Sequence, residues 1–287
     1  MEDVQNYGDG RRIDIDQVGV RELRYPISVM DRENQVQQTI ARISMAVGLP
    51  HHFKGTHMSR FIEVLNEHRG ELTMRTLPSM LSDLKGRLDA ETARVEVSFP
   101  YFIERSAPVS GAEAPVDYEC EFIAEANGEG DDFVLAVRVP VTTLCPCSKT
   151  ISEYGAHNQR GYIKVQVRTE RDDDGLPQLL WIEELIELAE KSGSAPVYSL
   201  LKRSDERHVT MQAYDNPVFV EDVVRNVSEH LRADSRVAWY FVEAETLESI
   251  HHHNAYAQVT WKRPSEHQVE EAAEVADRQL SVATATS

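Results

Sequence analysis

The chain has 287 residues, of which 41% are hydrophobic and 27% charged, and its 30 Lys and Arg face 48 Asp and Glu for a net charge of −18 at pH 7. This length allows one large core or two domains of ordinary size. The negative field disfavours nucleic acid and anionic membrane surfaces as partners, and no segment approaches the ~18 uninterrupted apolar residues of a membrane helix. We therefore expect neither nucleic-acid nor membrane partners, and an anionic small-molecule substrate would need a local basic pocket.

The amino-terminal stretch MEDVQNYGDGRR is polar and lacks the apolar segment of a secretory signal. The three cysteines, Cys120, Cys145 and Cys147, are an odd number in a chain of this size. Reduced thiols or a metal ligand suit that number better than a disulfide framework. We expect a cytoplasmic protein.

The first half shows strand and helix periods in turn. Two helices are predicted by apolar residues spaced three and four apart over 58–65 and 77–88, and the alternation from Val95 to Ile103 predicts a strand with one buried face. The element order expected over 18–127 is strand, strand, helix, helix, strand, strand.

The second half repeats this order without a visible sequence repeat. The continuously apolar segments 133–141 and 237–242 predict strands covered on both sides, and alternation predicts strands over 163–167 and 255–261. Helical spacing recurs over 179–189 and 219–231. We expect an α+β chain with a flexible N-terminus (1–17), two modules (18–130 and 131–263) and a flexible acidic tail (264–287).

The stretch LCPCSKTISEYGAHNQRG (144–161) is the first candidate site. Cys145 and His157 suit zinc or a similar divalent ion, and a strand end followed by its returning loop could bring them together. Pro146 is expected to hold the backbone extended, so that Cys145 and Cys147 point to opposite sides and only one is a ligand. The alternative is a packed thiol beside a loop histidine that is hydrogen-bonded to the backbone.

Three histidines follow one another in ESIHHHN (248–254). On an extended segment His251 and His253 share one face, and Ile250 with the apolar strand beyond suggests a partly buried setting. The alternative is a solvated run.

Two further stretches concentrate charge. Lys202, Arg203 and Arg207 lie together beside apolar residues and suggest a phosphate-facing loop, although a solvated charge run is the default. Glu221 begins a predicted helix, where it could equally be a capping residue. In the first half, His51, His52 and His57 suggest a pocket wall or a subunit contact.

Six ordered blocks closely resemble the type IB GTP cyclohydrolase I family: RYPISVMDR, GLPHHFKGTHMSRF, PVTTLCPCSKTISEYGAHNQRG, SLLKRSDERHVT, NPVFVEDVVRN and ESIHHHNAYA. They run from about residue 18 to 262. The resemblance implies two tandem tunnelling-fold modules of order ββααββ, with antiparallel sheets, helices packed on one face and assembly into a homotetramer. It also implies hydrolysis of GTP to 7,8-dihydroneopterin triphosphate and formate, the first step of tetrahydrofolate biosynthesis.

Carried over residue by residue, the resemblance implies one divalent metal per active site (Zn, Mn or Fe(II)). Such a metal would lower the pKa of a bound water molecule, so that this water could act as a nucleophile near neutral pH. Its ligands would be Cys145, His157, Glu206 and His251. Glu221 would anchor the guanine, because a carboxylate accepts from both N1–H and the exocyclic amine. The chain departs from the family pattern at His252, and we expect His251 to bind the metal and His253 to carry protons.

The remaining roles fall on polar residues around these ligands. Glu248 would orient an imidazole or share the proton transfers, or is an ordinary carboxylate at a strand end. Lys202, Arg203 and Lys149 are the candidates for the triphosphate. The alternatives are a deazaguanine nitrile reductase of the same fold, release of a cyclic phosphate product, or a zinc-stabilised purine-binding protein without turnover.

Overall fold

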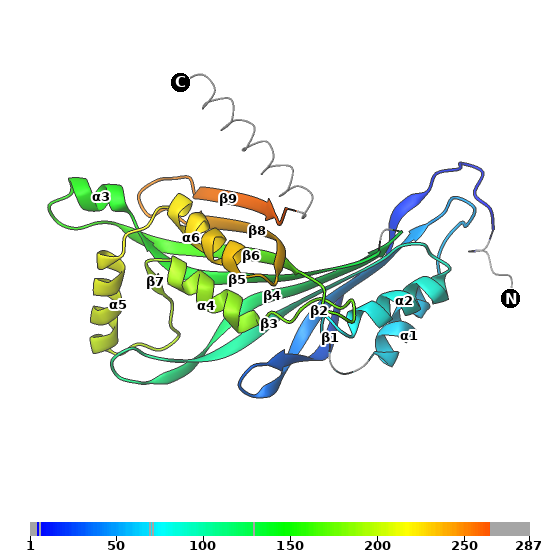
Figure 1. Ribbon diagram of the computed structural model, residues 1–287, viewed down its shortest axis with the longest axis horizontal. Coiled ribbons are helices and arrows are strands. Elements are labelled where there is room, and N and C mark those ends of the chain that lie inside the picture. The colour runs from blue at the N-terminus through cyan, green and yellow to red at the C-terminus, as the bar shows by residue number, and fades with distance from the viewer. Residues whose placement is uncertain (1–4, 6, 69, 71, 129, 265–287) are drawn as a thin grey trace, which may run out of the picture.

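The computed structural model describes residues 5–264 except 6, 69, 71 and 129. Its main feature is one antiparallel sheet with strand order β1-β2-β3-β4-β5-β6-β8-β9, while β7 pairs with β5 (Figure 1). The strands are β1 (Ile15–Asp31), β2 (Gln35–Leu49), β3 (Ala93–Ser106), β4 (Glu113–Asn127), β5 (Gly130–Leu144), β6 (Asn158–Thr169), β7 (Ala195–Pro196), β8 (Val237–Thr246) and β9 (Ala255–Lys262).

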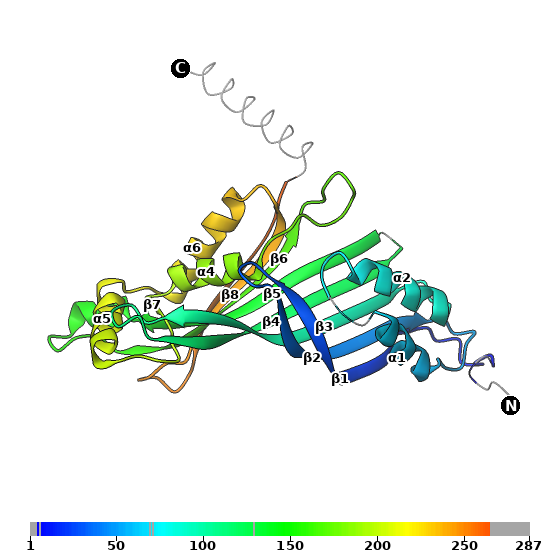
Figure 2. The same ribbon diagram turned by 90° about the horizontal axis from the view of Figure 1, so that it is seen from below.

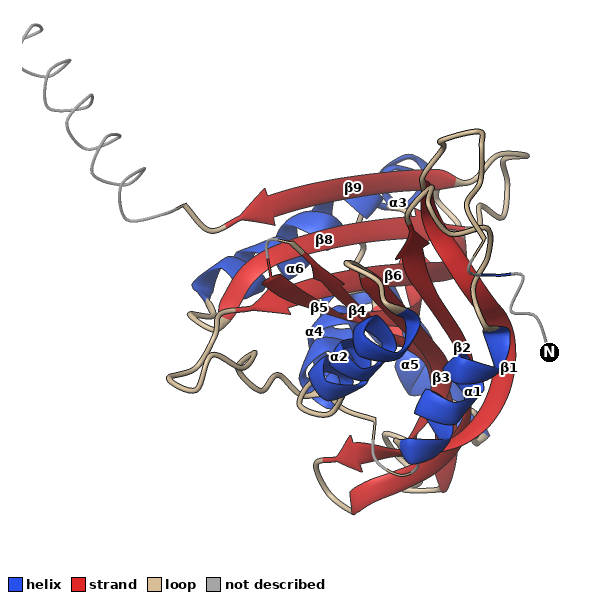
Figure 3. Ribbon diagram, turned by 90° about the vertical axis from the view of Figure 1, so that its right-hand side faces the viewer, coloured by secondary structure: helices blue, strands red, loops and turns tan. Residues whose placement is uncertain are grey.

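The described helices are α1 (Met58–Glu67), α2 (Leu77–Leu88), α3 (Pro146–Ile151), α4 (Ile182–Ser192), α5 (Arg203–Asp215) and α6 (Val220–Ala233). The apolar stripes of α1, α2, α4 and α6 join the buried side chains of one sheet face in a continuous core. One row of this face crosses the sheet through paired positions from Ile43 and Val97 to Tyr240 and Trp261. Figures 2 and 3 show these helices against the sheet.

The predicted α+β class and most predicted elements are confirmed. The order strand, strand, helix, helix, strand, strand is found in both halves, with α3, β7 and α5 added in the second. β4 and β5 pair directly, so the sheet runs without a break across the expected boundary at residue 130. β1 begins at Ile15, and the predicted tail lies outside the described residues after Pro264.

A buried polar network joins the two halves. Tyr101 on β3 donates its hydroxyl to Glu183 Oε1 on α4 (2.7 Å), and the backbone N–H of Arg32 donates to the same oxygen (2.8 Å). Burial, reinforced by the Glu183 carboxylate, raises the pKa of Tyr101 far above its ordinary value. Tyr118 on β4 donates similarly to Glu190 (2.5 Å). These bonds attach α4 to strands of the first half.

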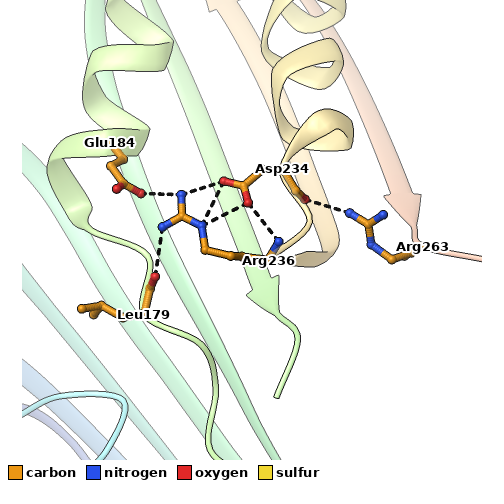
Figure 4. Close-up of polar contacts among 5 residues, drawn as sticks. All are labelled: Leu179, Glu184, Asp234, Arg236 and Arg263. Carbon is orange, nitrogen blue, oxygen red and sulfur yellow. Dashed lines mark hydrogen bonds and ion pairs between the residues drawn. The ribbon is translucent and has the colours of Figure 1, made fainter. Parts of the chain in front are cut away.

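A second network ties the elements of the second half to one another (Figure 4). The guanidinium of Arg236 binds Asp234 (2.7 Å) and Glu184 on α4 (2.9 Å), and it donates to the carbonyl of Leu179 (3.1 Å). Arg263, just beyond β9, donates to the carbonyl of Asp234 (2.8 Å). The hydrogen bonds from Arg236 outweigh burial and lower the pKa of Asp234. This network holds α4, the α6–β8 turn and the end of β9 together.

No helix within the described residues has the length and apolar character needed to cross a membrane.

Candidate active site

The ends of β5, β6 and β8 meet at one end of the sheet. Leu144 pairs with Asn158, and Gly161 pairs with Thr246. Figure 1 shows α3, α5 and the loop between β8 and β9 at this same end. The polar side chains that follow these strand ends therefore come together, and we call them the strand-end site: Cys145, His157, Gln159, Glu248 and the first turn of α6.

Cys145 and His157 are held at neighbouring positions by backbone and by Ser148. The N–H of Cys145 donates to the carbonyl of His157 (3.2 Å). Ser148 donates its own N–H to Cys145 Sγ (3.4 Å), and its hydroxyl accepts from the N–H of His157 (3.0 Å). The end of β5 and the loop that returns to β6 therefore bring Cys145 and His157 together. The role of Ser148 was missed, because a serine at this position carries no distinctive signal in the sequence.

The expected extended backbone after Cys145 was wrong. Cys145 itself is extended, but Pro146 is the first residue of helix α3, with Cys145 as its N-cap. Proline is favoured at this position because its fixed φ suits a helix and its missing N–H is not needed there. Cys145 is half-buried and Cys147 is exposed, so the two thiols differ in environment.

A hydrogen-bonded chain leads from His157 to Glu248. Nδ1 of His157 lies 2.8 Å from Gln159 Oε1 and 3.3 Å from Ser249 Oγ. Gln159 Nε2 donates to Glu248 Oε1 (3.2 Å), which also accepts from the Thr246 hydroxyl (2.9 Å). Glu248 is therefore linked to the His157 imidazole through one side chain, Gln159, which belongs to no charged or histidine-rich pattern of the sequence.

The first turn of α6 closes this site on a third side. The N–H of Val218 donates to the carbonyl of Leu144 (3.2 Å), which brings the start of α6 beside Cys145. Asp222, not Glu221, caps the helix, by accepting from the N–H of Phe219 (3.1 Å). Glu221 is exposed in the same turn and so remains available for a ligand.

Helix α5 carries Lys202 at its N-cap and Arg203 and Glu206 in its first turn; all three are exposed. The buried residue here is Asp205. Its carboxylate accepts from the N–H groups of Val109 and Ser110 (both 2.8 Å) and of Lys202 (2.8 Å), and from the Ser110 hydroxyl (2.7 Å). Burial opposes ionisation, but these bonds outweigh it and hold the pKa of Asp205 well below its usual range. Asp205 thus anchors α5 to the loop between β3 and β4.

The far end of α5 contacts α3 instead. Lys149 Nζ donates to the carbonyl of Tyr214 (2.5 Å) and lies 4.3 Å from the centre of its ring. Lys202 is twelve residues earlier, which corresponds to about 18 Å along a helix. One chain therefore does not bring Lys149 and Lys202 to the same phosphate, and Glu206 lies about 12 Å along α5 from the Lys149 contact.

The histidine run lies in the loop between β8 and β9. His251 and His253 do share a face, because their rings stack with centroids 5.2 Å apart. The expected partial burial was wrong, since His251, His252, His253 and Ile250 are all exposed in the single chain. The strand that was expected to cover them begins only at Ala255 and faces solvent along one side.

Within the described residues, no group of three or more His, Cys, Asp or Glu side chains is close enough to hold a metal ion. Cys145 and His157 are neighbours, but neither Glu206 nor His251 joins them in such a group. In the first half, His51 binds Asp14 (2.8 Å) and lines with His52 a hollow of about 660 Å³. That hollow lies at the end of β2, where the loop to α1 begins. Figure 1 shows this loop at the far end of the sheet from α3, so the hollow is separate from the strand-end site.

The fold is shared with uricases. The uricase from Arthrobacter globiformis superposes on this chain with a TM-score of 0.50 at 9% sequence identity. The superposition covers 89% of this chain and 97% of the uricase. A mutant of the Bacillus sp. TB-90 urate oxidase matches 87% of this chain and all of its own with a TM-score of 0.51 at 8% identity. Identities this low show a common fold and nothing about the reaction.

Similarity in sequence identifies the family of this chain. Residues 1–257 match the family model described as type I GTP cyclohydrolase folE2. A "GTP cyclohydrolase FolE2" from Syntrophotalea carbinolica is 54% identical over 90% of this chain and 94% of the relative. A "GTP cyclohydrolase FolE2" from Syntrophus aciditrophicus is also 54% identical, over 90% of this chain and 99% of the relative. The chain belongs to the FolE2 family of type I GTP cyclohydrolases, which confirms the resemblance seen in the sequence.

Proposed function

We propose that this chain is a GTP cyclohydrolase I, which opens the guanine ring of GTP at C8 and gives 7,8-dihydroneopterin triphosphate and formate, the first step of tetrahydrofolate biosynthesis. The observation that carries the proposal is the family match over residues 1–257, with relatives of this name 54% identical over nearly their whole length. The strand-end site supports it, because a thiol, an imidazole and a carboxylate converge there.

The architecture supports a division into two tandem tunnelling-fold modules, 18–130 and 131–263, between the N-terminal segment and the acidic tail. Each contains four long strands of the sheet with a pair of packed helices, and the second also contains the short β7. β1 and β9 are the outermost strands, and assembly of the chain into a homotetramer would give such edges partners. The proposal places the enzyme in the cytoplasm, where its three free thiols stay reduced.

The donor set suits one divalent ion, Zn, Mn or Fe(II): Cys145, His157, Glu206 and His251 would hold it. The bound ion would lower the pKa of a water molecule and so supply a nucleophile near neutral pH. Cys145 and His157 are already neighbours, and the exposed loop that carries His251 follows Ser249, which contacts His157. The complete set would form only on binding, as is common when metal binding and local ordering are coupled.

The other residues of the site bind and orient the substrate or move protons. Glu221, exposed at the start of α6 beside Cys145, would accept from N1–H and the exocyclic amine of guanine. His253 would carry protons to and from the opened ring, with Glu248 linked to His157 as a second proton acceptor. Lys202 with Arg203 at the N-terminus of α5 would hold the triphosphate, or Lys149 would do so nearer to Cys145.

The position of Glu206 favours a site shared between copies of the chain. α5 is anchored through Asp205, so its first turn is not free to move to Cys145. In a homotetramer with sites near subunit boundaries, another copy would supply the carboxylate. Mixing the inactive variants Cys145→Ala and Glu206→Ala should then restore part of the activity, whereas two variants that must act in the same chain, Cys145→Ala and His157→Ala, should not complement each other.

The direct test is incubation with GTP, with and without a chelator, with formate and pterin fluorescence after oxidation as readouts. Metal-replete protein should give both products, and protein with chelator should give neither. Cys145→Ala should abolish turnover, while the matched variant Cys147→Ala should retain it, because Cys147 is exposed in the first turn of α3. Metal-replete protein that releases no formate would refute the proposed function.

A further inference from the structure

Gln159 lies between the two groups to which the proposed function gives the most chemistry. It is the second residue of β6, opposite Thr143 on β5, and its side chain lies on the helix-covered side of the sheet. One end of its amide contacts His157 Nδ1 at 2.8 Å and the other contacts Glu248 Oε1 at 3.2 Å. A side chain that bridges a candidate metal ligand and a carboxylate is placed to fix the state of that ligand.

Only one orientation of the Gln159 amide makes both hydrogen bonds. A carboxylate accepts and does not donate, so the group that faces Glu248 must be the NH₂ of the amide. The carbonyl oxygen of Gln159 then faces His157, and it can only accept. His157 Nδ1 must therefore carry the hydrogen, which leaves Nε2 as the atom with the free lone pair.

We propose that Gln159 is a positioning residue, which holds His157 in the Nδ1–H tautomer and so directs the lone pair of Nε2 to a metal ion. The metal-binding role of His157 rests on the proposed function, whereas the position of Gln159 rests on its hydrogen bonds to His157 and Glu248. Thr246 strengthens the chain, because its hydroxyl donates to the Glu248 oxygen that Gln159 also contacts (2.9 Å). Removing an outer partner of this kind typically weakens metal binding by about 10- to 100-fold.

The first measurement uses metal-free protein. Long-range ¹H–¹⁵N spectra of histidine-labelled protein, at alkaline pH where free imidazole is neutral, report which ring nitrogen carries the hydrogen. The signal of His157 is assigned by its loss in His157→Ala. Wild-type protein should show the Nδ1–H tautomer. Gln159→Leu should lose it, and Gln159→Glu should keep it, because a carboxylate still accepts from Nδ1–H.

The second measurement is Zn²⁺ affinity against a competing chelator, in the same variants. Gln159→Leu should bind Zn²⁺ about 10- to 100-fold more weakly than wild type. Gln166→Leu is the matched control, because Gln166 is half-buried on the opposite face of β6 and should leave both tautomer and affinity unchanged. If Gln159 had only a structural role, Gln159→Leu and Gln159→Glu should have the same effect on the tautomer of His157. Different tautomers in these two variants therefore indicate a positioning role.

Two results would overturn the inference. One is a wild-type His157 that carries its hydrogen on Nε2. The other is a Gln159→Leu variant with the wild-type tautomer and the wild-type Zn²⁺ affinity. A wild-type protein that binds Zn²⁺ but releases no formate from GTP would instead refute the proposed function and leave the role of Gln159 standing.

Discussion

Removing the hydrogen bond between Tyr101 and Glu183 tests directly how the two halves of the chain are joined. Tyr101 is fully buried, and its hydroxyl is one of two donors to Glu183 Oε1. Glu183 Oε2 is buried without a partner among the described residues, so the carboxylate has little to replace a lost bond. A hydrogen bond to a charged group contributes about 1.5–3 kcal/mol. Tyr101→Phe should therefore lower the free energy of unfolding by about 2 kcal/mol.

The assay is urea unfolding followed by circular dichroism and by tryptophan fluorescence, which should coincide if the transition is two-state. In a thermal scan the same loss corresponds to about 3 °C in Tm for a chain of this size. Tyr256→Phe, at a position 68% exposed, is the control and should change stability by less than about 0.5 kcal/mol. In a Glu183→Met background, removal of the Tyr101 hydroxyl should cost much less.

The pH dependence has a definite sign. Because the pKa of Tyr101 is raised in the folded state, its contribution to stability is fully present below the ordinary tyrosine pKa of about 10 and is lost as pH rises above it. The difference between wild type and Tyr101→Phe should narrow at strongly alkaline pH. A Tyr101→Phe variant as stable as wild type at pH 7 would refute the proposed joint between the halves.

Four further variants test other parts of the structure. Gly193→Ala should lower the free energy of unfolding by about 1–3 kcal/mol, because the added Cβ would lie 2.8 Å from Val141 Cβ. The control Gly86→Ala, on α2, places its Cβ where nothing lies within 4 Å and should raise the free energy of unfolding by about 0.5–1 kcal/mol. Thermal unfolding measures both variants, and equal effects would contradict the close approach at Gly193. Asp234→Asn should cost about 1 kcal/mol at pH 7. Because the pKa of Asp234 is lowered in the folded state, this cost should be fully present above the unfolded pKa of about 4 and should shrink as pH falls towards the folded pKa; a cost that does not change with falling pH would exclude this linkage. Glu221→Ala should raise the KM for GTP and reduce selectivity against ATP, measured by formate release; an unchanged preference would remove Glu221 from the guanine site.

Hydrophobic periodicity was enough to predict the main strands and the four packed helices. The alternation from Val95 to Ile103 became β3, and the stripe over 219–231 became α6. Helix α5 was missed because only Asp205 and Ala213 are buried on it, so it has almost no apolar stripe. Helix α3 was missed because Pro146, read as an extended residue, serves there as a helix start.

The sequence alone determined the class of fold, the family and the residue types available for chemistry, since these depend on local periodicity and on motifs that are contiguous in the chain. Only the tertiary structure decided which of these residues meet. Strand pairing across β5, β6 and β8 brings Cys145, His157 and Glu248 together through Ser148 and Gln159, which carry no distinctive signal in the sequence. The anchoring of α5 by Asp205 keeps Glu206 away from them, because hydrogen bonds to a loop almost a hundred residues earlier place that helix.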